Sequence, residues 1–112
     1  MDKRFHVYMM ASGYRGTLYV GVTSDLRWRV WEHRTHHHPG FTKQYGVTRL
    51  VWYDAFDGPR AAIAFEKRLK RYKREWKINR IEEQNPTWND LYALLFGLTP
   101  NELAAWDDRY PE

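Results

Sequence analysis

The stretch "FHVYMMASGYRGTLYVGV", residues 5–22, decides the fold of this protein. Side chains alternate between two faces over Phe5–Ala11 and again over residues 17–22, and this period of two is typical of β-strands. The linking segment "SGYRG" contains Gly13 and Gly16, which we expect to supply positive φ angles in a turn. Two alternating runs joined by a short turn predict a β-hairpin.

The two faces of this hairpin differ in composition. The leucine and the valines of the second strand form an apolar face, which we expect to build the core. If the register brings the apolar faces of both strands together, Tyr8 and Tyr19 share the opposite face, beside Gly21. Glycine weakens a strand unless a ligand or another backbone approaches closely. This second face is therefore either ordinary buried surface or part of a binding site.

After the hairpin the sequence predicts a helix, a loop and a third strand. Asp25, or Ser24 before it, can cap a helix that runs to about residue 36. The segment "HHHPGFTKQYG", residues 36–46, has the composition of a loop. The segment "TRLVWYDAF", residues 48–56, is rich in β-branched and aromatic residues, as strands are.

The second half of the chain is predicted to be mainly helical. Pro59 suits the first turn of a long helix, and apolar residues recur after it at helical spacing. The predicted buried stripe consists of Ala62, Phe65, Leu69, Tyr72 and Trp76. "TWND" and "TPNE" resemble capping boxes that open short helices at Thr87 and Thr99. The fold class is thus α/β in the broad sense and α+β in the narrow one: a small, mainly antiparallel three-stranded sheet flanked by helices.

Composition limits the classes of function. The chain has 112 residues, which favours one domain, and no apolar run approaches the ~20 residues needed to span a bilayer. Cysteine is absent, which excludes disulfides and cysteine nucleophiles and fits a reducing cytoplasm. Residues 87–112 hold one basic and five acidic side chains, whereas the preceding part holds seventeen basic and nine acidic ones. This basic body indicates either a polyanionic partner or a solubilising surface.

Two helical positions are candidates for chemistry. Arg29 and His33 stand four residues apart and therefore share one helix face, which is either a solvated surface or part of a site. Glu66 lies beside the predicted buried stripe, where a carboxylate needs a partner: a basic side chain, hydrogen-bond donors or a metal. Three adjacent histidines at residues 36–38 lack the spacing of a metal site.

A basic run follows Glu66 and has two aromatics interleaved. It is opposed only by Glu75. Such a run either binds phosphates with release of counterions or forms a solvated surface. Its basic residues are Lys67, Arg68, Lys70, Arg71, Lys73, Arg74, Lys77 and Arg80.

Taken together, these residues resemble the GIY-YIG nuclease superfamily, and within it the small stand-alone bacterial members. The first motif stands as "HVY" at residues 6–8, with His-Val in place of Gly-Ile, and the second as "YVG" at residues 19–21. Arg29 follows in the next helix, and Glu66 stands where the family places its metal-binding glutamate. The resemblance implies a nuclease domain over residues 1–90. It leaves residues 91–112 as a helical appendage that packs on the same domain.

The resemblance also implies an activity: a metal-dependent endonuclease that hydrolyses DNA phosphodiester bonds, with structure selectivity and a link to repair or recombination as further expectations. Glu66 would hold one Mg²⁺ or Mn²⁺ ion. Tyr8 would take the proton of the attacking water, for which nearby cations must lower its pKa. Tyr19 would position water or phosphate, and Arg29 would offset charge on the phosphoryl oxygens. His33 would assist by hydrogen bonding or serve as an alternative general base.

Contacts to flanking phosphates would supply affinity without sequence preference. The residues expected to make them are Gly21, Arg27, Lys43, Lys67, Lys70, Arg71 and Arg74. The family places a supporting asparagine after the glutamate in some members, and Asn79 is the nearest candidate here. The main alternative is a nucleic-acid-binding module with little or no catalysis, for which RNA stays open as a ligand. The apolar part of the C-terminal segment either docks a partner or caps the protein's own sheet.

Overall fold

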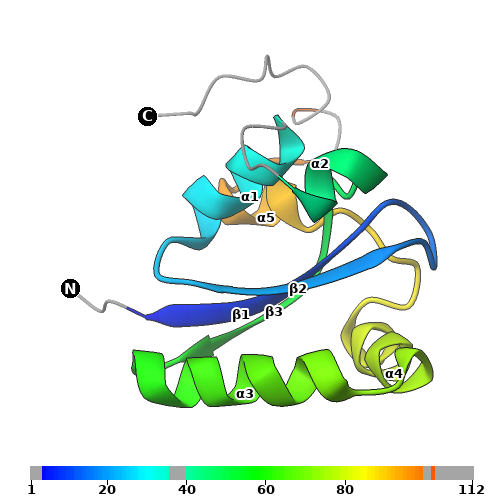
Figure 1. Ribbon diagram of the computed structural model, residues 1–112. Coiled ribbons are helices and arrows are strands. Elements are labelled where there is room, and N and C mark those ends of the chain that lie inside the picture. Colours follow the sequence, from blue (N-terminus) through cyan, green and yellow to red (C-terminus); the bar gives the residue numbers. More distant parts are fainter. Residues whose placement is uncertain (1–3, 36–39, 100–101, 103–112) are drawn as a thin grey trace.

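The computed structural model describes residues 4–35, 40–99 and 102 and contains one three-stranded sheet with helices on both faces (Figure 1). Its strand order is β2-β1-β3, and both pairs are antiparallel, which confirms the predicted α+β class. The elements are β1 (Phe5–Ala11), β2 (Leu18–Thr23), α1 (Leu26–Arg34), α2 (Phe41–Tyr45), β3 (Arg49–Phe56), α3 (Pro59–Arg71), α4 (Arg74–Gln84) and α5 (Tyr92–Leu95).

The sheet separates two hydrophobic clusters. We call the face covered by α1, α2 and α5 the upper face, and the face covered by α3 and α4 the lower face (Figure 1). The buried residues of the upper cluster are Tyr8, Met10, Leu26, Val30, Val47, Leu50 and Tyr92. Those of the lower cluster are Val7, Met9, Ala11, Val20, Val51, Trp52, Ala62, Leu69, Ile81 and Trp88. Both faces of β1 are therefore buried, so the hairpin has no open face.

The predicted hairpin is present, with Tyr8 paired to Gly21 and Val7 to Val22. The turn differs from the prediction, because among its residues the positive φ belongs to Arg15, at 49°, and not to a glycine. Contacts from α4 hold this turn. Arg15 donates to the Glu82 carboxylate, and Arg74 donates to the backbone carbonyls of Arg15 and Gly16. Tertiary contacts thus offset the strain of a left-handed arginine.

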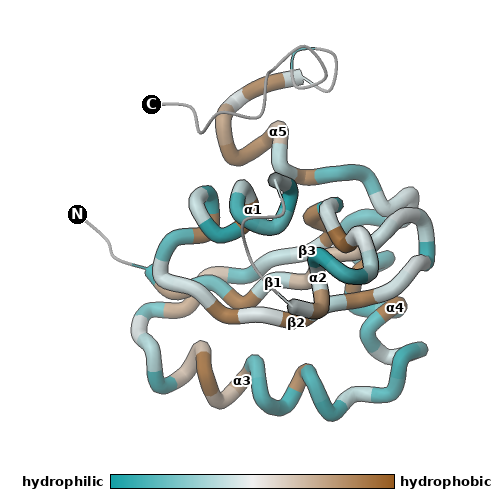
Figure 2. The backbone as a smooth tube through the Cα atoms, turned by 45° about the horizontal axis from the view of Figure 1, so that its top comes forward, coloured by the Kyte–Doolittle hydropathy of each residue, from teal (hydrophilic) through white to brown (hydrophobic). Residues whose placement is uncertain are grey.

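The predicted long helix is two helices. Tyr72 is extended, with φ −61° and ψ 143°, so α3 ends at Arg71 and α4 starts at Arg74. The change of direction takes Trp76 out of the buried stripe, and its side chain is 50% exposed. Along α3, hydrophilic and hydrophobic residues alternate, as an amphipathic helix requires (Figure 2).

Two other local predictions also need correction. The predicted loop over residues 36–46 contains the helix α2, bounded by Gly40 at φ 97° and Gly46 at φ 64°. No helix begins at Thr87; the backbone there is irregular until α5. By contrast, the capping box at Thr99 is confirmed, because Thr99 and Glu102 exchange backbone-to-side-chain hydrogen bonds. The histidines at residues 36–38 lie outside the described residues.

The segment predicted as a C-terminal appendage begins with α5, which is mostly hydrophobic and lies against α1 (Figure 2). Tyr92 and Ala93 of α5 are almost fully buried, so this part of the segment belongs to the upper cluster. Asp90 joins it to the sheet by accepting from the backbone N–H of Leu50 and of Tyr92. Within the described ranges, no helix has the length and apolar character required to cross a membrane.

Candidate active site

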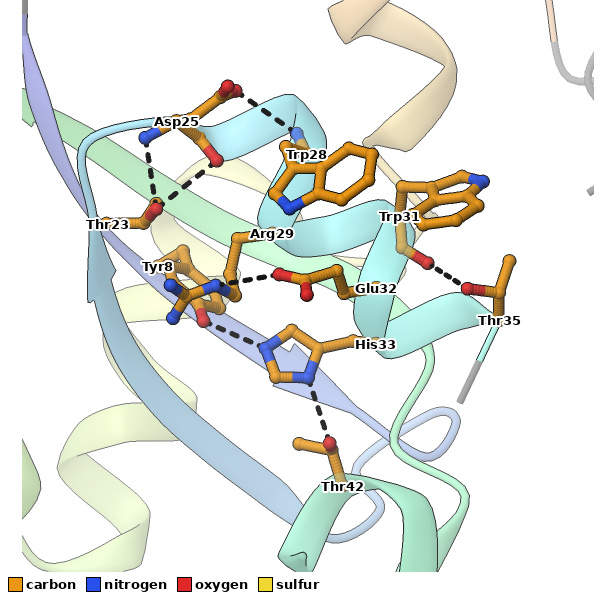
Figure 3. Close-up of polar contacts among 10 residues, drawn as sticks. All are labelled: Tyr8, Thr23, Asp25, Trp28, Arg29, Trp31, Glu32, His33, Thr35 and Thr42. Atoms are coloured by element: carbon orange, nitrogen blue, oxygen red, sulfur yellow. Dashed lines mark hydrogen bonds and ion pairs between the residues drawn. The ribbon is translucent and has the colours of Figure 1, made fainter. Parts of the chain in front are cut away.

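A buried tyrosine lies at the centre of the upper face. Tyr8, on the middle strand β1, is 0% exposed, and its Oη lies 2.9 Å from His33 Nε2 of α1 (Figure 3). Gly21 lies opposite Tyr8 on β2, and a Cβ atom at Gly21 would come within 2.5 Å of the Tyr8 ring and hydroxyl. The glycine is therefore needed to make room for the tyrosine ring, and this explains the Tyr-x-Gly pattern in β2.

His33 connects Tyr8 to a third element. The ring is 0% exposed in the last turn of α1, and its Nδ1 lies 2.9 Å from Thr42 Oγ1 of α2 (Figure 3). Both ring nitrogens of His33 thus have partners. Thr42 belongs to the segment predicted as a loop, and sequence patterns did not single it out because a lone threonine carries no spacing signal.

Arg29 lies one helical turn before His33, as predicted. Its Nε lies 3.2 Å from Glu32 Oε1 in an ion pair, and its charge and a side-chain hydrogen bond act on Tyr8. Glu32 was not among the predicted site residues, although its i+3 spacing from Arg29 was a signal that could have found it. The predicted grouping of Tyr8, Arg29 and His33 is therefore present in the fold.

The electrostatics of Tyr8 differ from the expectation. Burial raises the pKa of the Tyr8 phenol well above its usual value, and Tyr19 and Glu32 add to the increase. The Arg29 guanidinium lowers the pKa but does not offset the burial. The expectation that neighbouring cations bring this pKa below its usual value is therefore wrong for the described side chains, because burial outweighs Arg29. Tyr8 is a neutral phenol at pH 7 and can accept a proton only if it passes its own proton on.

Tyr19 links the buried pair to the protein surface. Its ring centroid lies 6.2 Å from that of Tyr8 and 5.1 Å from that of His33. On its other side Tyr19 stacks on Phe41 of α2, at 6.3 Å between centroids and 29° between planes. Phe41 is 44% exposed. A ligand that reaches Tyr19 from solvent would pass this aromatic side chain.

Glu66 lies apart from these residues. It occupies the buried side of α3 between Ala62 and Leu69 and is 7% exposed. The helix α3 covers the lower face of the sheet (Figure 1), whereas Tyr8 belongs to the upper cluster. Its carboxylate forms an ion pair with Lys70 Nζ at 2.7 Å. The helix α3 packs against all three strands of the sheet.

The donor set at Glu66 fits only one kind of metal binding. Within residues 4–35, 40–99 and 102, no three His, Asp or Glu side chains gather where they could surround an ion. Mg²⁺ is commonly held by one or two carboxylates, with waters and substrate phosphates completing its shell. One carboxylate therefore fits Mg²⁺ or Mn²⁺ only in such a water-rich form, and Lys70 would have to release it.

The comparisons with known proteins identify the family of this arrangement. Residues 4–79 match the model of the GIY-YIG catalytic domain. The chain belongs to the GIY-YIG family. A UPF0213 protein of Haloquadratum walsbyi is 36% identical over 83 residues, which are 74% of this chain and 92% of that protein. A UPF0213 protein of Bacillus pumilus is 30% identical over the same share of this chain and 85% of its own length.

A solved structure supports the fold. The solution NMR structure of a UPF0213 protein of Bacillus halodurans aligns with a TM-score of 0.50 at 24% identity, covering 86% of this chain and 99% of that one. At this identity the likeness concerns the fold alone. The GIY-YIG domain itself is the catalytic domain of a nuclease family, so it implies endonuclease activity and a nucleic-acid substrate.

The first GIY-YIG motif of this chain has a histidine, His6, where the family has a glycine, and this histidine lies beside a groove. His6, which replaces the first glycine, borders a groove of about 520 Å³ next to the start of α1. The groove is lined by Arg4, His6, Ser24, Asp25, Leu26, Arg27, Tyr53, Leu94 and Leu95. Burial and then the Arg4 charge lower the pKa of His6, while Asp54 opposes them.

The predicted phosphate-binding residues of the GIY-YIG domain fall into two groups. Arg27 and Lys43 are exposed on the upper side, on α1 and α2. The others belong to α3 and α4: Lys67, Lys70, Arg71 and Arg74. Lys67 and Arg71 are exposed, but Lys70 pairs with Glu66 and Arg74 holds the hairpin turn.

The two asparagines of this region differ in their surroundings. Asn79 is exposed on α4. Sequence patterns missed Asn85, whose buried amide donates to the carbonyls of Val51 and Asn89. Asn85 thus supports the fold.

Proposed function

We propose that this protein is a divalent-metal-dependent endonuclease that hydrolyses DNA phosphodiester bonds. The observation that carries the proposal is the buried Tyr8–His33 hydrogen bond, with Arg29 beside it, inside a GIY-YIG catalytic domain. A buried tyrosine and histidine in contact provide proton transfer, and an arginine provides a positive charge for a phosphoryl group. These are the two requirements of phosphodiester hydrolysis.

In this proposal each residue has one role. Tyr8 accepts the proton of the attacking water, Arg29 stabilises charge on the phosphoryl oxygens, and Tyr19 orients the water or the phosphate. His33 receives or shares the Tyr8 proton. Glu66 would hold Mg²⁺ or Mn²⁺ once the phosphate displaces Lys70, and such an ion stabilises charge at the leaving 3′ oxygen.

Flanking contacts complete the proposed substrate site. Arg27 and Lys43 would bind phosphates on the upper side, and Lys67, Lys70, Arg71 and Arg74 would bind them along α3 and α4. Gly21 contributes by admitting Tyr8. Selectivity for branched or flapped DNA, a role in repair or recombination, and a cytoplasmic location belong to the same proposal and stay predictions.

The test is cleavage of branched, flapped and linear DNA, with an RNA arm, in the presence of Mg²⁺, Mn²⁺ or EDTA. We expect cleavage that requires the metal and falls by about 10²–10³-fold in Arg29→Ala and in Glu66→Gln, because each loses charge stabilisation in the transition state. Arg60→Ala is the matched control, since Arg60 is an exposed arginine in the first turn of α3. Equal cleavage by the wild type and both variants would refute the proposal.

One observation favours a second candidate, a nucleic-acid-binding module without catalysis. Glu66 is already neutralised by Lys70 and lies on the lower side, away from Tyr8. This candidate predicts salt-dependent DNA binding that survives Glu66→Gln, with no cleavage under any metal condition. Filter binding at several salt concentrations, run with the cleavage assay, separates the two candidates.

A further inference from the structure

Thr42 is the described residue whose position the proposed roles leave unexplained. It is 1% exposed although it belongs to a five-residue helix whose other side chains are exposed. Its Oγ1 points at His33 Nδ1 from the side opposite Tyr8, at 2.9 Å (Figure 3). A threonine hydroxyl can donate or accept a hydrogen bond, so the proton distribution of the neighbouring groups decides which it does.

The protons can be assigned from Tyr8 outward. The Tyr8 phenol is buried and protonated, so its O–H needs an acceptor. Arg29 is a cation whose charge acts on Tyr8, and because a guanidinium has only donors it cannot accept the phenol proton. In the part of the chain that the structure describes, the remaining partner of Tyr8 Oη is His33 Nε2. Tyr8 therefore donates to His33 Nε2, and Nε2 carries a lone pair.

The position of the proton on the His33 imidazole follows from the hydrogen bond with Tyr8. A neutral histidine that accepts at Nε2 carries its proton at Nδ1. The Nδ1–H then donates to Thr42 Oγ1. The opposite tautomer would direct an N–H at the Tyr8 phenol oxygen, and among the described residues it would leave the phenol proton without an acceptor. Burying an unsatisfied donor is unfavourable, which favours the Nδ1–H tautomer.

We propose that Thr42 is a positioning residue that accepts from His33 Nδ1–H and so holds the ring with its Nε2 lone pair directed at the Tyr8 phenol. Its effect on catalysis rests on the proposed nuclease function, whereas the tautomer itself does not. The ring orientation is set from three elements at once: β1 supplies Tyr8, α1 supplies His33, and α2 supplies Thr42.

In the proposed reaction, Tyr8 accepts a proton from water and gives its own proton to His33. As the water oxygen bonds to phosphorus, its proton passes to Tyr8 Oη, while the Tyr8 proton passes to His33 Nε2. The bond to the 3′ oxygen breaks, and that oxygen keeps the electron pair and takes a proton from solvent. His33 becomes imidazolium, and Thr42 Oγ1 accepts from Nδ1–H before and after the transfer. Thr42 thus favours proton acceptance without touching the substrate.

Other polar and charged groups surround the pair and influence its pH dependence. Arg29 and Glu32 face it from α1, and Tyr19 faces it from β2. Lys43 follows Thr42 on α2 and is exposed. Thr42→Val leaves all four unchanged, so a difference between the pH profiles of wild type and variant reports the hydroxyl.

The experiment compares Thr42→Val, Thr42→Ser and the control Thr48→Val, which makes the same chemical change at a half-buried position before β3. Histidine ¹⁵N chemical shifts, with His33 assigned from His33→Gln, report which ring nitrogen is protonated. We expect Nδ1–H in the wild type, in Thr42→Ser and in the control. In Thr42→Val the Nδ1–H loses its acceptor, so we expect an altered Nδ1 chemical shift and faster exchange of its proton with solvent. We also expect kcat to fall about tenfold or more in Thr42→Val, with an altered pH profile and an unchanged KM for DNA.

Two results would overturn the inference. One is an Nε2–H His33 in the wild type, or an Nδ1 chemical shift and proton exchange rate that are unchanged in Thr42→Val. The other is a Thr42→Ser variant that loses as much activity as Thr42→Val, because serine retains the hydroxyl. If wild type and variants all fail to cleave while the Nδ1 signal changes as expected, the nuclease proposal fails and the positioning role of Thr42 stands.

Discussion

The upper and lower faces of the sheet each bury a polar group, but they satisfy it in different ways. On the upper face, Tyr8 and His33 are held by hydrogen bonds that join β1, α1 and α2. On the lower face, Glu66 is paired only with Lys70 of the same helix, one turn away, and the Lys70 side chain is 54% exposed. A group held from three elements is rigid, whereas an exposed lysine can leave its carboxylate at little cost.

The two faces are therefore suited to different parts of the proposed reaction. In the proposed mechanism the upper face is preorganised for proton transfer, since hydrogen bonds set the positions of Tyr8 and His33 before any substrate binds. The lower carboxylate is paired with a lysine that a cation could displace. The first two predictions concern the packing and burial of Tyr8 on the upper face, and the third concerns the replacement of Lys70 by a cation at Glu66 on the lower face.

The largest effect is expected for Gly21→Ala. The added Cβ would lie 2.5 Å from the Tyr8 ring and hydroxyl, so the ring must move away from His33. We expect a loss of about 2–3 kcal/mol in unfolding free energy, as for other overpacked cores, and loss of most nuclease activity. Urea unfolding and a cleavage assay measure the two effects. Gly58→Ala is the control, because no atom lies within 4 Å of the Cβ position there; equal behaviour of the two variants would contradict the close packing.

A smaller effect is expected from alkaline pH. The pKa of Tyr8 is higher in the folded protein than in the unfolded chain, so folding is favoured below the ordinary phenol pKa near 10. That contribution is lost as the pH rises above 10 toward the folded pKa, because the unfolded chain releases the proton first. Between pH 9 and 11 we expect the wild type to lose about 1 kcal/mol more stability than Tyr8→Phe. Parallel losses in the two proteins would show that Tyr8 titrates normally.

The smallest effect is expected for Lys70→Gln. Removing the ammonium frees the Glu66 carboxylate for a cation, but the pair is partly exposed and therefore weak. We expect the Mg²⁺ concentration for half-maximal cleavage to fall by about two- to fivefold. Lys73→Gln is the control, since Lys73 is an exposed lysine outside the proposed substrate site. A Mg²⁺ requirement that rises in Lys70→Gln would contradict the exchange of Lys70 for a cation.

The sequence was sufficient for features that depend on local periodicity. The bounds of β1 agree with the prediction at both ends, and the predicted pairing of the two apolar faces places Tyr8 opposite Gly21. Asp25 caps α1 as predicted, by accepting from the backbone N–H of Trp28. Arg29 and His33 share a helix face because four residues make about one turn. Each of these features is decided within one element or one hairpin.

The predictions that were wrong concern local structures that depend on contacts between distant segments of the chain. The helix α2 forms in a segment of loop composition because its Thr42 is buried against His33 and its ends fall at glycines with positive φ. The positive φ at Arg15 depends on contacts from Glu82 and Arg74 of α4. No periodicity within a short window carries such information.

The sequence by itself determined the strands, the hairpin register and the family, because alternation, turn composition and motif order are local properties of the chain. Only the tertiary structure decided that Tyr8 is buried, that its pKa is raised rather than lowered, and that Thr42 completes the site. It also decided that Glu66 lies on the other side of the sheet, paired with Lys70. The physical reason is that burial and desolvation depend on what covers a residue, and here the covering elements come from distant parts of the chain.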